Sequence, residues 1–339
     1  MTSNPTLLGA HDSARDAPAK MAAVPRRPRI GRKAAYLAFA GVLLVLLIIA
    51  NAVVNPVAFG AAQMPTTVGL AAPLVLAAMA VTPAVLVGGG GIDLSVGPLM
   101  SLVGAVVIVD VIGTLHGSSP AVVIPVALGV GVASGLLTGV LVALLRLQPI
   151  VATLGTYLAY TGLTLIVAPQ PTGSVPSWLA TMAQDGSIPT LAVVFVAWWL
   201  FSRTPLYEAL MATGGEDRAA FVAGVPVTTV RIMAYTISGL LAAIGGLSLA
   251  ALLGSADPNA GAQYTLLGIA AVALGGVSLA GGRGGMFGAV VGALDVFLIQ
   301  NVLTFYNITS FVEQVVYGAI LVVAVCINRL MGAKVGGAR

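Results

Sequence analysis

The chain has 339 residues, of which 58% are hydrophobic and 8% charged, with a net charge of +4 and a mean hydropathy of +1.04. So few charges cannot cover the surface of a water-soluble globule, which excludes a soluble protein and predicts an integral membrane protein. The apolar runs have the length of membrane-crossing helices, about 20 residues, and the alternating segments typical of outer-membrane barrels are missing. The predicted fold class is all-α and polytopic.

The first 33 residues differ in composition from the rest. They are polar, contain four prolines, and end in the basic run RRPRIGRK. Because they hold too little apolar surface to fold, we expect residues 1–33 to form a disordered basic cytosolic tail. The hydrophobic stretch that follows, from about Ala34 to Val54, is too long for the apolar part of a cleavable signal peptide. We therefore expect it to remain as the first span.

Ten apolar runs predict a membrane domain over residues 34–330, followed by a short cytosolic tail, 331–339. The third, sixth and eighth runs are short, which predicts at least one broken or tilted helix. The runs lie near residues 34–54, 66–88, 96–113, 120–145, 150–168, 188–202, 228–253, 264–280, 286–305 and 309–328.

The distribution of basic residues predicts the orientation of this domain. With a cytosolic N-terminus, ten spans place five connecting segments outside the cell, and none of the five contains a lysine or arginine. All 15 basic residues fall on the tails, the inner loops or their flanks, as the positive-inside rule requires. Both termini are therefore predicted to be cytoplasmic.

Motifs of soluble catalysis are absent. The chain has no GxxxxGK[ST] phosphate loop, no HExxH and no CxxC, so we predict that it is not an enzyme and carries no cofactor or metal of its own. Two glycine-rich stretches resemble each other, GGIDLSVG (90–97) and GGVSLAGG (275–282). Such an echo indicates either an internal repeat with broken helices or a chance similarity between glycine turns.

The longest inner segment, about residues 203–227, is the one polar, helix-capable stretch that faces the cytosol besides the tail. Its charged residues alternate in sign, and a break at Gly214 and Gly215 separates its short apolar faces. We expect a short helix that begins near Glu216, with acidic residues in its first turn. From these residues alone, a partner-docking segment and an ordinary solvated loop are equally compatible with the pattern.

Four motifs in order resemble a known family: GGIDLSVG (90–97), PIVATLGT (149–156), ATGGEDRAAFVAGV (212–225) and the glycine-rich run 257–294. Over about residues 35–330 the chain is similar to ABC-importer permeases of the ribose/xylose/arabinose type, in the branched-chain-type permease superfamily. The resemblance implies a ten-helix subunit of the bacterial cytoplasmic (inner) membrane that passes a monosaccharide or related small sugar.

The resemblance also implies partners. They are a cytosolic ABC ATPase that holds ATP and magnesium, an extracytoplasmic sugar-binding protein, a second permease copy or paralogue, and the lipid bilayer, with no nucleic acid. The family's cytoplasmic coupling helix matches residues 212–225, which implies ATPase-coupling roles for Gly214, Gly215, Glu216, Ala219, Ala220 and Gly224. The chain departs from the family pattern at Pro98, Tyr207 and Glu216.

The signature turn, with Gly90, Gly91, Asp93, Ser95 and Gly97, is a candidate part of the translocation path. Asp93 either caps the start of the third span with help from Ser95, or hydrogen-bonds a sugar hydroxyl. Asp110, Asp295 and Glu313 are further acids in or beside spans, each costly in lipid. Weaker path candidates are Asn51, Gln63, Thr153, Asn259, Gln300 and Asn301.

Two other classes of function stay open from the sequence. An ion-coupled secondary transporter would also be helical and glycine-rich, but it needs intramembrane charges for coupling, and the acids here are few and scattered. A membrane scaffold that transports nothing is the second alternative.

Overall fold

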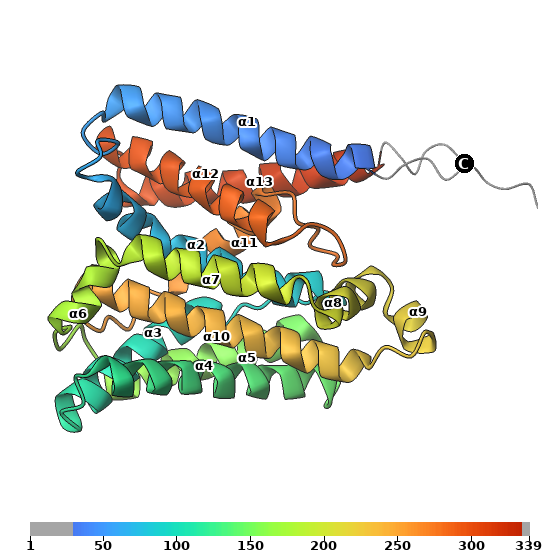
Figure 1. Cartoon of the computed structure of the whole chain (residues 1–339), viewed down its shortest axis with the longest axis horizontal. Coiled ribbons are helices and arrows are strands. Elements are labelled where there is room, and N and C mark those ends of the chain that lie inside the picture. The colour runs from blue at the N-terminus through green and yellow to red at the C-terminus, as the bar shows by residue number, and fades with distance from the viewer. Residues whose placement is uncertain (1–29, 334–339) are drawn as a thin grey trace, which may run out of the picture.

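The computed structural model describes residues 30–333, which form a bundle of helices that run side by side along one axis (Figure 1). The termini beyond this range, including most of the predicted basic tail, lie outside the described residues. The elements are α1 (Ile30–Val54), α2 (Met64–Leu86), α3 (Val96–Ala105), the π-helical η1 (Val106–Thr114), α4 (Pro120–Ala143), α5 (Pro149–Val167), α6 (Ser177–Ala180), the 3₁₀ turn η2 (Thr181–Ala183), α7 (Ser187–Phe201), α8 (Pro205–Gly215), α9 (Asp217–Val222), α10 (Val227–Leu253), α11 (Ala262–Leu274), α12 (Met286–Phe305) and α13 (Ser310–Ala333).

The all-α membrane prediction is confirmed in its coarse form. Six helices of the described chain are long and apolar enough to cross a bilayer: α2, α3 continued by η1, α4, α5, α10 and α12. The pair α6/η2 and α7 adds a seventh candidate that bends by 74° at its break, and α1, α11 and α13 contain shorter apolar stretches. Each apolar run predicted from the sequence falls on one of these helices, and the short sixth run falls on α7 of the bent pair.

The core forms around α2 and α10. Helix α10 packs against α2, α3 and α4, and almost every residue of α2 from Ala71 onward is buried. A helix that is apolar on all sides is stable only when it is surrounded, which explains the central position of α2. Gly131 and Gly135 bring α4 so close to α10 that a Cβ at either would overlap the α10 backbone. These α4 glycines therefore allow the two helices to pack closely.

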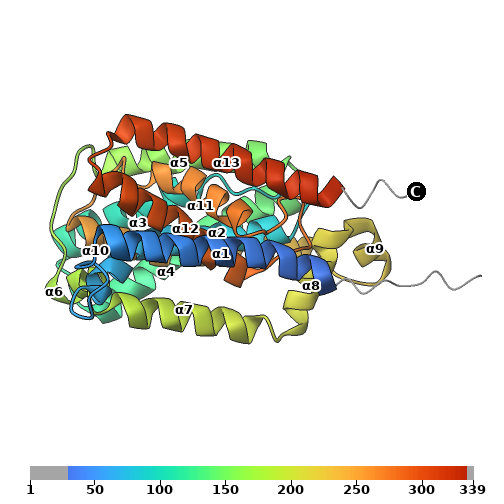
Figure 2. The same cartoon turned by 90° about the horizontal axis from the view of Figure 1, so that it is seen from above.

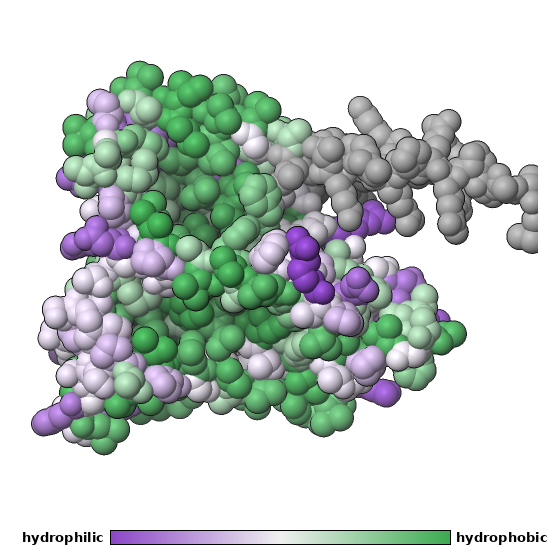
Figure 3. All heavy atoms as spheres, in the orientation of Figure 1, coloured by the Kyte–Doolittle hydropathy of each residue, from purple (hydrophilic) through white to green (hydrophobic). Residues whose placement is uncertain are grey.

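The two ends of the bundle differ from its sides. The short helices α8 and α9 project at one end, and α6 lies at the other (Figures 1 and 2). Hydrophobic residues cover the long flanks of the face shown in Figure 3, whereas hydrophilic residues gather toward the two ends. This distribution suits a bundle whose flanks meet lipid and whose ends meet water.

Candidate functional site

Most of the signature turn belongs to the loop between α2 and α3, residues 87–95, which we call the signature loop. This loop enters the bundle without regular secondary structure. Gly88, Gly89 and Gly90 turn it with φ values of 75°, 66° and 74°, in the left-handed region that glycine adopts without strain. The Thr153 hydroxyl on α5 donates to the Ile92 carbonyl at 3.1 Å and ties the loop to a neighbouring helix. Backbone of this kind is tolerated at membrane depth only where protein surrounds it.

Asp93 anchors the loop from the inside. The Ser95 N–H and hydroxyl donate to Asp93 Oδ1 at 2.9 and 2.7 Å, and the Ser238 hydroxyl of α10 donates to Asp93 Oδ2 at 2.8 Å. The predicted cap needs correction, because no side chain caps the first turn of α3, and Asp93 bonds the residue that precedes it. Both carboxylate oxygens are thus occupied by groups of the protein itself.

A second loop enters the bundle from the other side, between α10 and α11, and meets the first. The Thr265 hydroxyl accepts from the Gly97 N–H at 3.0 Å and donates to the Leu94 carbonyl at 3.1 Å. The Ser101 hydroxyl accepts from the Gly261 N–H at 2.9 Å and donates to the Asp257 carbonyl at 3.0 Å. The starts of α3 and α11 therefore exchange equivalent hydrogen bonds.

This exchange reveals an internal repeat. Both loops carry Asp, a polar residue two places on, Gly four places on and a hydroxyl residue eight places on: Asp93 to Ser101 and Asp257 to Thr265. Asp257 Oδ1 accepts from the Asn259 N–H at 2.9 Å, as Asp93 does from Ser95. Within the sequence, the glycines of 90–97 resemble those of 275–282. In the structure, the segment that pairs with the signature loop is 257–265. The shared Asp and hydroxyl spacing was the signal that could have identified it.

The glycines of this contact permit no side chain. A Cβ at Gly97 would overlap the Gly261 carbonyl oxygen, and a Cβ at Gly261 would overlap that of Gly97.

We expect Thr265→Val to destabilise the protein by about 1–3 kcal/mol, because the buried Gly97 N–H loses its acceptor. Thr265→Ser, which keeps the hydroxyl, is the matched control. Equal melting temperatures for the purified valine and serine variants would contradict the role of the hydroxyl.

The glycine run 275–282 forms a different contact, at the end of the bundle where α8 and α9 lie. The Gly282 N–H donates to the Leu86 carbonyl at 3.0 Å. A Cβ at Gly214, near the end of α8, would overlap the Leu86 carbonyl oxygen, and a Cβ at Gly281 would overlap the Gly88 backbone. Three segments far apart in the chain thus meet through backbone alone. We call Gly88, Gly214, Gly281 and Gly282 the glycine junction.

The inner segment forms two short helices joined at the glycine junction. The expected helix is present as α9, with Asp217 in its first turn and Glu216 extended before it. An ion pair of 2.9 Å between Asp217 Oδ2 and Arg231 Nη2 fastens α9 to α10. The exposed coupling candidates are Gly215, Glu216, Ala219 and Gly224, whereas Ala220 is buried and Gly214 half-buried.

Helix α9 exposes two apolar side chains, of which Phe221 was not singled out from the sequence. Phe221 is 71% exposed and Val222 is 86% exposed, on a helix that projects from the end of the bundle (Figure 1). On the preceding helix, Tyr207 packs edge-on against Trp198 and Phe201. Burial raises the pKa of Tyr207, so its hydroxyl stays protonated.

The weaker path candidates do not converge on one cavity. Asn51 holds α1 to α12 by donating to the Leu298 carbonyl at 3.1 Å, and Thr153 holds the signature loop. Gln63 is exposed before α2, and Asn259 is exposed in the second loop. The half-buried pair is Gln300 and Asn301, on α12.

The other acids occupy three different environments. Asp110 is exposed on η1, and Glu313 accepts from Thr304 and Tyr317 hydroxyls, each at 3.2 Å. Asp295 is fully buried on α12, and within the described part of the chain neither of its carboxyl oxygens has a hydrogen-bond partner. A polar group that is buried without a partner costs free energy.

Comparison with known proteins identifies the family. The family model described as "Branched-chain amino acid transport system / permease component" matches residues 63–325. The chain belongs to this permease family. The matched part of the permease contains both loops, the glycine junction, α8 and α9. No solved structure matches it.

Similar curated proteins agree with this assignment. The permease is 36% identical over 265 residues to the ribose import permease protein RbsC of Escherichia coli strain K12, covering 74% of this chain and 81% of the relative. It is 36% identical over 254 residues to RbsC of Bacillus subtilis, covering 72% and 78%. It is 34% identical over 230 residues to the galactose/methyl galactoside import permease protein MglC of Salmonella typhimurium, covering 63% and 68%.

Proposed function

We propose that this chain is the transmembrane permease subunit of an ATP-driven ABC importer that moves a monosaccharide or related small sugar across the bacterial inner membrane. The observation that carries the proposal is its similarity to ribose and galactose import permeases over most of the chain, at 34–36% identity. The sugar arrives from an extracytoplasmic binding protein, and the ATP is hydrolysed by a separate subunit that binds magnesium. Neither rival function has a comparable observation in its favour.

The proposed topology has ten crossings, with both termini in the cytoplasm. Ten helical segments coincide with the ten apolar runs, and the basic residues Arg146, Arg203, Arg218 and Arg231 lie in or next to connections at the α8 and α9 end. By the positive-inside rule this end faces the cytosol. The η2–α7 break and the two inserted loops account for the runs that are short for a bilayer.

The cytosolic ATPase docks on α9 in this proposal. Exposed Phe221 and Val222 lie on a helix that projects from the bundle, so burial in a groove of a partner would stabilise them. Exposed small residues on the same segment, Ala219 and Gly224, allow close approach. The ion pair between Asp217 and Arg231 and the glycine junction connect this surface to α10 and α2.

Phe221→Ala is expected to weaken binding of the ATPase at least about tenfold, because a buried aromatic anchor contributes about 2 kcal/mol or more to an interface. The measurement is co-purification of the co-expressed ATPase, with insertion of the permease followed separately. Phe305→Ala, at the opposite end of α12 from the cytosol, is the matched control, since Phe305 is 48% exposed. Unchanged ATPase recovery with Phe221→Ala would argue against docking on α9.

Uptake in reconstituted vesicles tests the function itself. Vesicles that contain this permease, its genomically neighbouring ATPase and the binding protein should take up labelled ribose or galactose only when ATP is present on the ATPase side. Uptake by the permease alone, driven by an ion gradient, would replace the proposal with a secondary transporter. A permease that recovers no ATPase and whose deletion leaves uptake intact would indicate a scaffold.

A further inference from the structure

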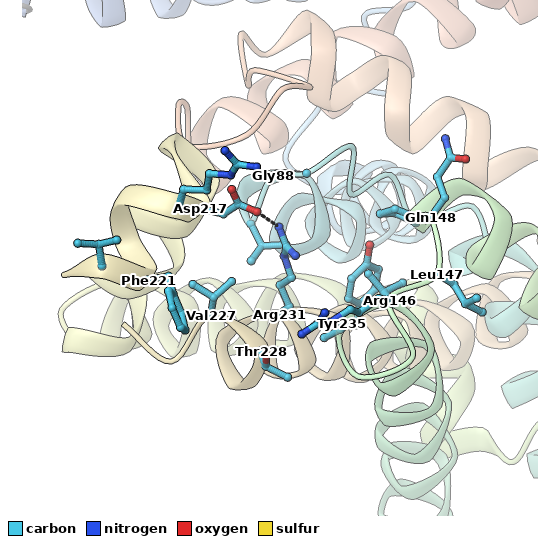
Figure 4. Close-up of a pocket in the computed structure, with 17 residues that line it drawn as sticks. Gly88, Arg146, Leu147, Gln148, Asp217, Phe221, Val227, Thr228, Arg231 and Tyr235 are labelled. Atoms are coloured by element: carbon cyan, nitrogen blue, oxygen red, sulfur yellow. Dashed lines mark hydrogen bonds and ion pairs between the residues drawn. The ribbon is translucent and has the colours of Figure 1, made fainter. Parts of the chain in front are cut away.

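We propose that the cavity between α4, α9 and α10 binds the headgroup of an anionic phospholipid. The cavity has a volume of about 780 Å³, within the range of about 300–1,000 Å³ typical of small-ligand sites. Figure 4 shows Arg231 and Tyr235 on one wall, Asp217 and Phe221 on another, and Arg146 on the connection from α4 to α5. The site rests on the proposed function only for its cytosolic orientation.

The charge of the cavity favours an anion. Arg146, Arg218 and Arg231 line it together with a single acid, Asp217. Asp217 pairs with Arg231 at 2.9 Å, which is the one ion pair among the side chains that the structure describes. Arg146 and Arg218 therefore keep two positive charges without an acidic partner in the described chain. Guanidinium groups bind phosphate oxygens in a bidentate, charge-assisted manner.

A directional donor lies at the inner wall of the same cavity. Tyr235 is fully buried, and its hydroxyl has no hydrogen-bond partner among the described residues. In Figure 4 the hydroxyl points into the cavity, away from the α10 backbone. A buried hydroxyl without a partner is costly, so a ligand oxygen that accepts from Tyr235 would be stabilised there.

The surroundings favour a lipid over a free phosphate ion. The connection between α4 and α5 and the start of α5 expose apolar side chains on both sides of Arg146. Acyl chains can lie along such a surface while the headgroup phosphate meets the arginines, as in basic headgroup pockets between transmembrane helices. A free phosphate would gain nothing from these side chains. The exposed residues are Leu144, Leu145, Leu147, Ile150 and Val151.

Thermal unfolding of the full-length permease in uncharged detergent tests the site. Phosphatidylglycerol should raise the apparent melting temperature, whereas phosphatidylcholine and inorganic phosphate should not. The double variant Arg146→Gln/Arg218→Gln should raise the half-saturating phosphatidylglycerol concentration by about tenfold or more. Arg283→Gln, at an exposed arginine outside the cavity, is the control and should respond like the wild type.

Three results would overturn the proposal. They are equal stabilisation by phosphatidylcholine, equal stabilisation by inorganic phosphate alone, and an unchanged phosphatidylglycerol response in the double variant. If the double variant does not fold, Tyr235→Phe replaces it, since losing an unpartnered hydroxyl leaves the lipid-free fold intact and should weaken only lipid binding. Native mass spectrometry of the wild type with both lipids must then show a preference for phosphatidylglycerol. The permease is measured alone, so a negative result leaves the transport function unaffected.

Discussion

Gly214→Ala is expected to lower the stability of the permease by about 1–3 kcal/mol, the usual cost of overpacking, and to abolish sugar uptake. The added Cβ would overlap the Leu86 carbonyl oxygen and would also crowd the Gly282 N–H, which are both backbone atoms. Backbone cannot swing aside as a flexible side chain does, so the end of α8 must move away from the two turns. The measurements are the apparent melting temperature and ATP-dependent uptake in vesicles.

Gly215→Ala is the matched control for this prediction. It lies one residue further along α8, and a Cβ there meets nothing within 4 Å. Alanine at this position should leave stability unchanged or raise it by about 0.5–1 kcal/mol, because it reduces the freedom of the unfolded chain. Similar losses of stability from the two substitutions would show that the glycine junction has no particular role. Normal uptake with Gly214→Ala would show that the glycine junction is not needed for transport.

Asp93→Ala is expected to destabilise the permease by about 2–4 kcal/mol and to reduce uptake strongly. Its removal leaves three buried donors without an acceptor, the Ser95 N–H, the Ser95 hydroxyl and the Ser238 hydroxyl. Each buried donor left unsatisfied costs about 1–3 kcal/mol, reduced here by the ability of hydroxyls to turn. The melting temperature and uptake of the purified variant provide the measurement.

Two variants distinguish an anchor from a sugar-binding group at Asp93. Asp93→Asn keeps an acceptor for Ser95 and a polar partner for Ser238, so it should retain most of the stability and the uptake. Normal stability with lost uptake would instead place the carboxylate in the sugar path. Asp257→Ala, at the equivalent position of the second loop, should cost only about 0.5–1.5 kcal/mol, because its carboxylate accepts from one N–H in an exposed setting.

The local pattern of apolar residues was sufficient to predict the helical membrane architecture. Runs of about 20 apolar residues identified the helices because burial of an unpaired backbone in lipid is so costly that each crossing must be helical. The break at Gly214 and Gly215 and the acid at Asp217 likewise predicted α9, since glycine ends helices and acids favour their first turn. The role of Phe221 was missed because hydropathy alone does not distinguish a membrane-facing phenylalanine from an exposed one.

Contacts between distant residues could not be predicted in this way. The sequence predicted Asp93 at a helix start, but the bond to Ser238 depends on how α10 passes the loop. The similarity of 90–97 to 275–282 left a repeat and a chance match open, whereas the reciprocal bonds join Gly97 with Thr265 and Ser101 with Gly261. Asp295 could not be assigned an environment at all from its own segment.

The sequence by itself determined the helical membrane class, the order of the apolar segments, the one-sided distribution of arginine and lysine, and the position of α9. These follow from the hydropathy and charge of neighbouring residues, which act over a single helix. Only the tertiary structure decided that two inserted loops exchange hydrogen bonds inside the bundle and that Gly88, Gly214 and Gly281 meet at the end where α8 and α9 lie. Those contacts depend on how whole helices pack against each other. The residue periodicity within one segment does not determine the relative positions of the helices.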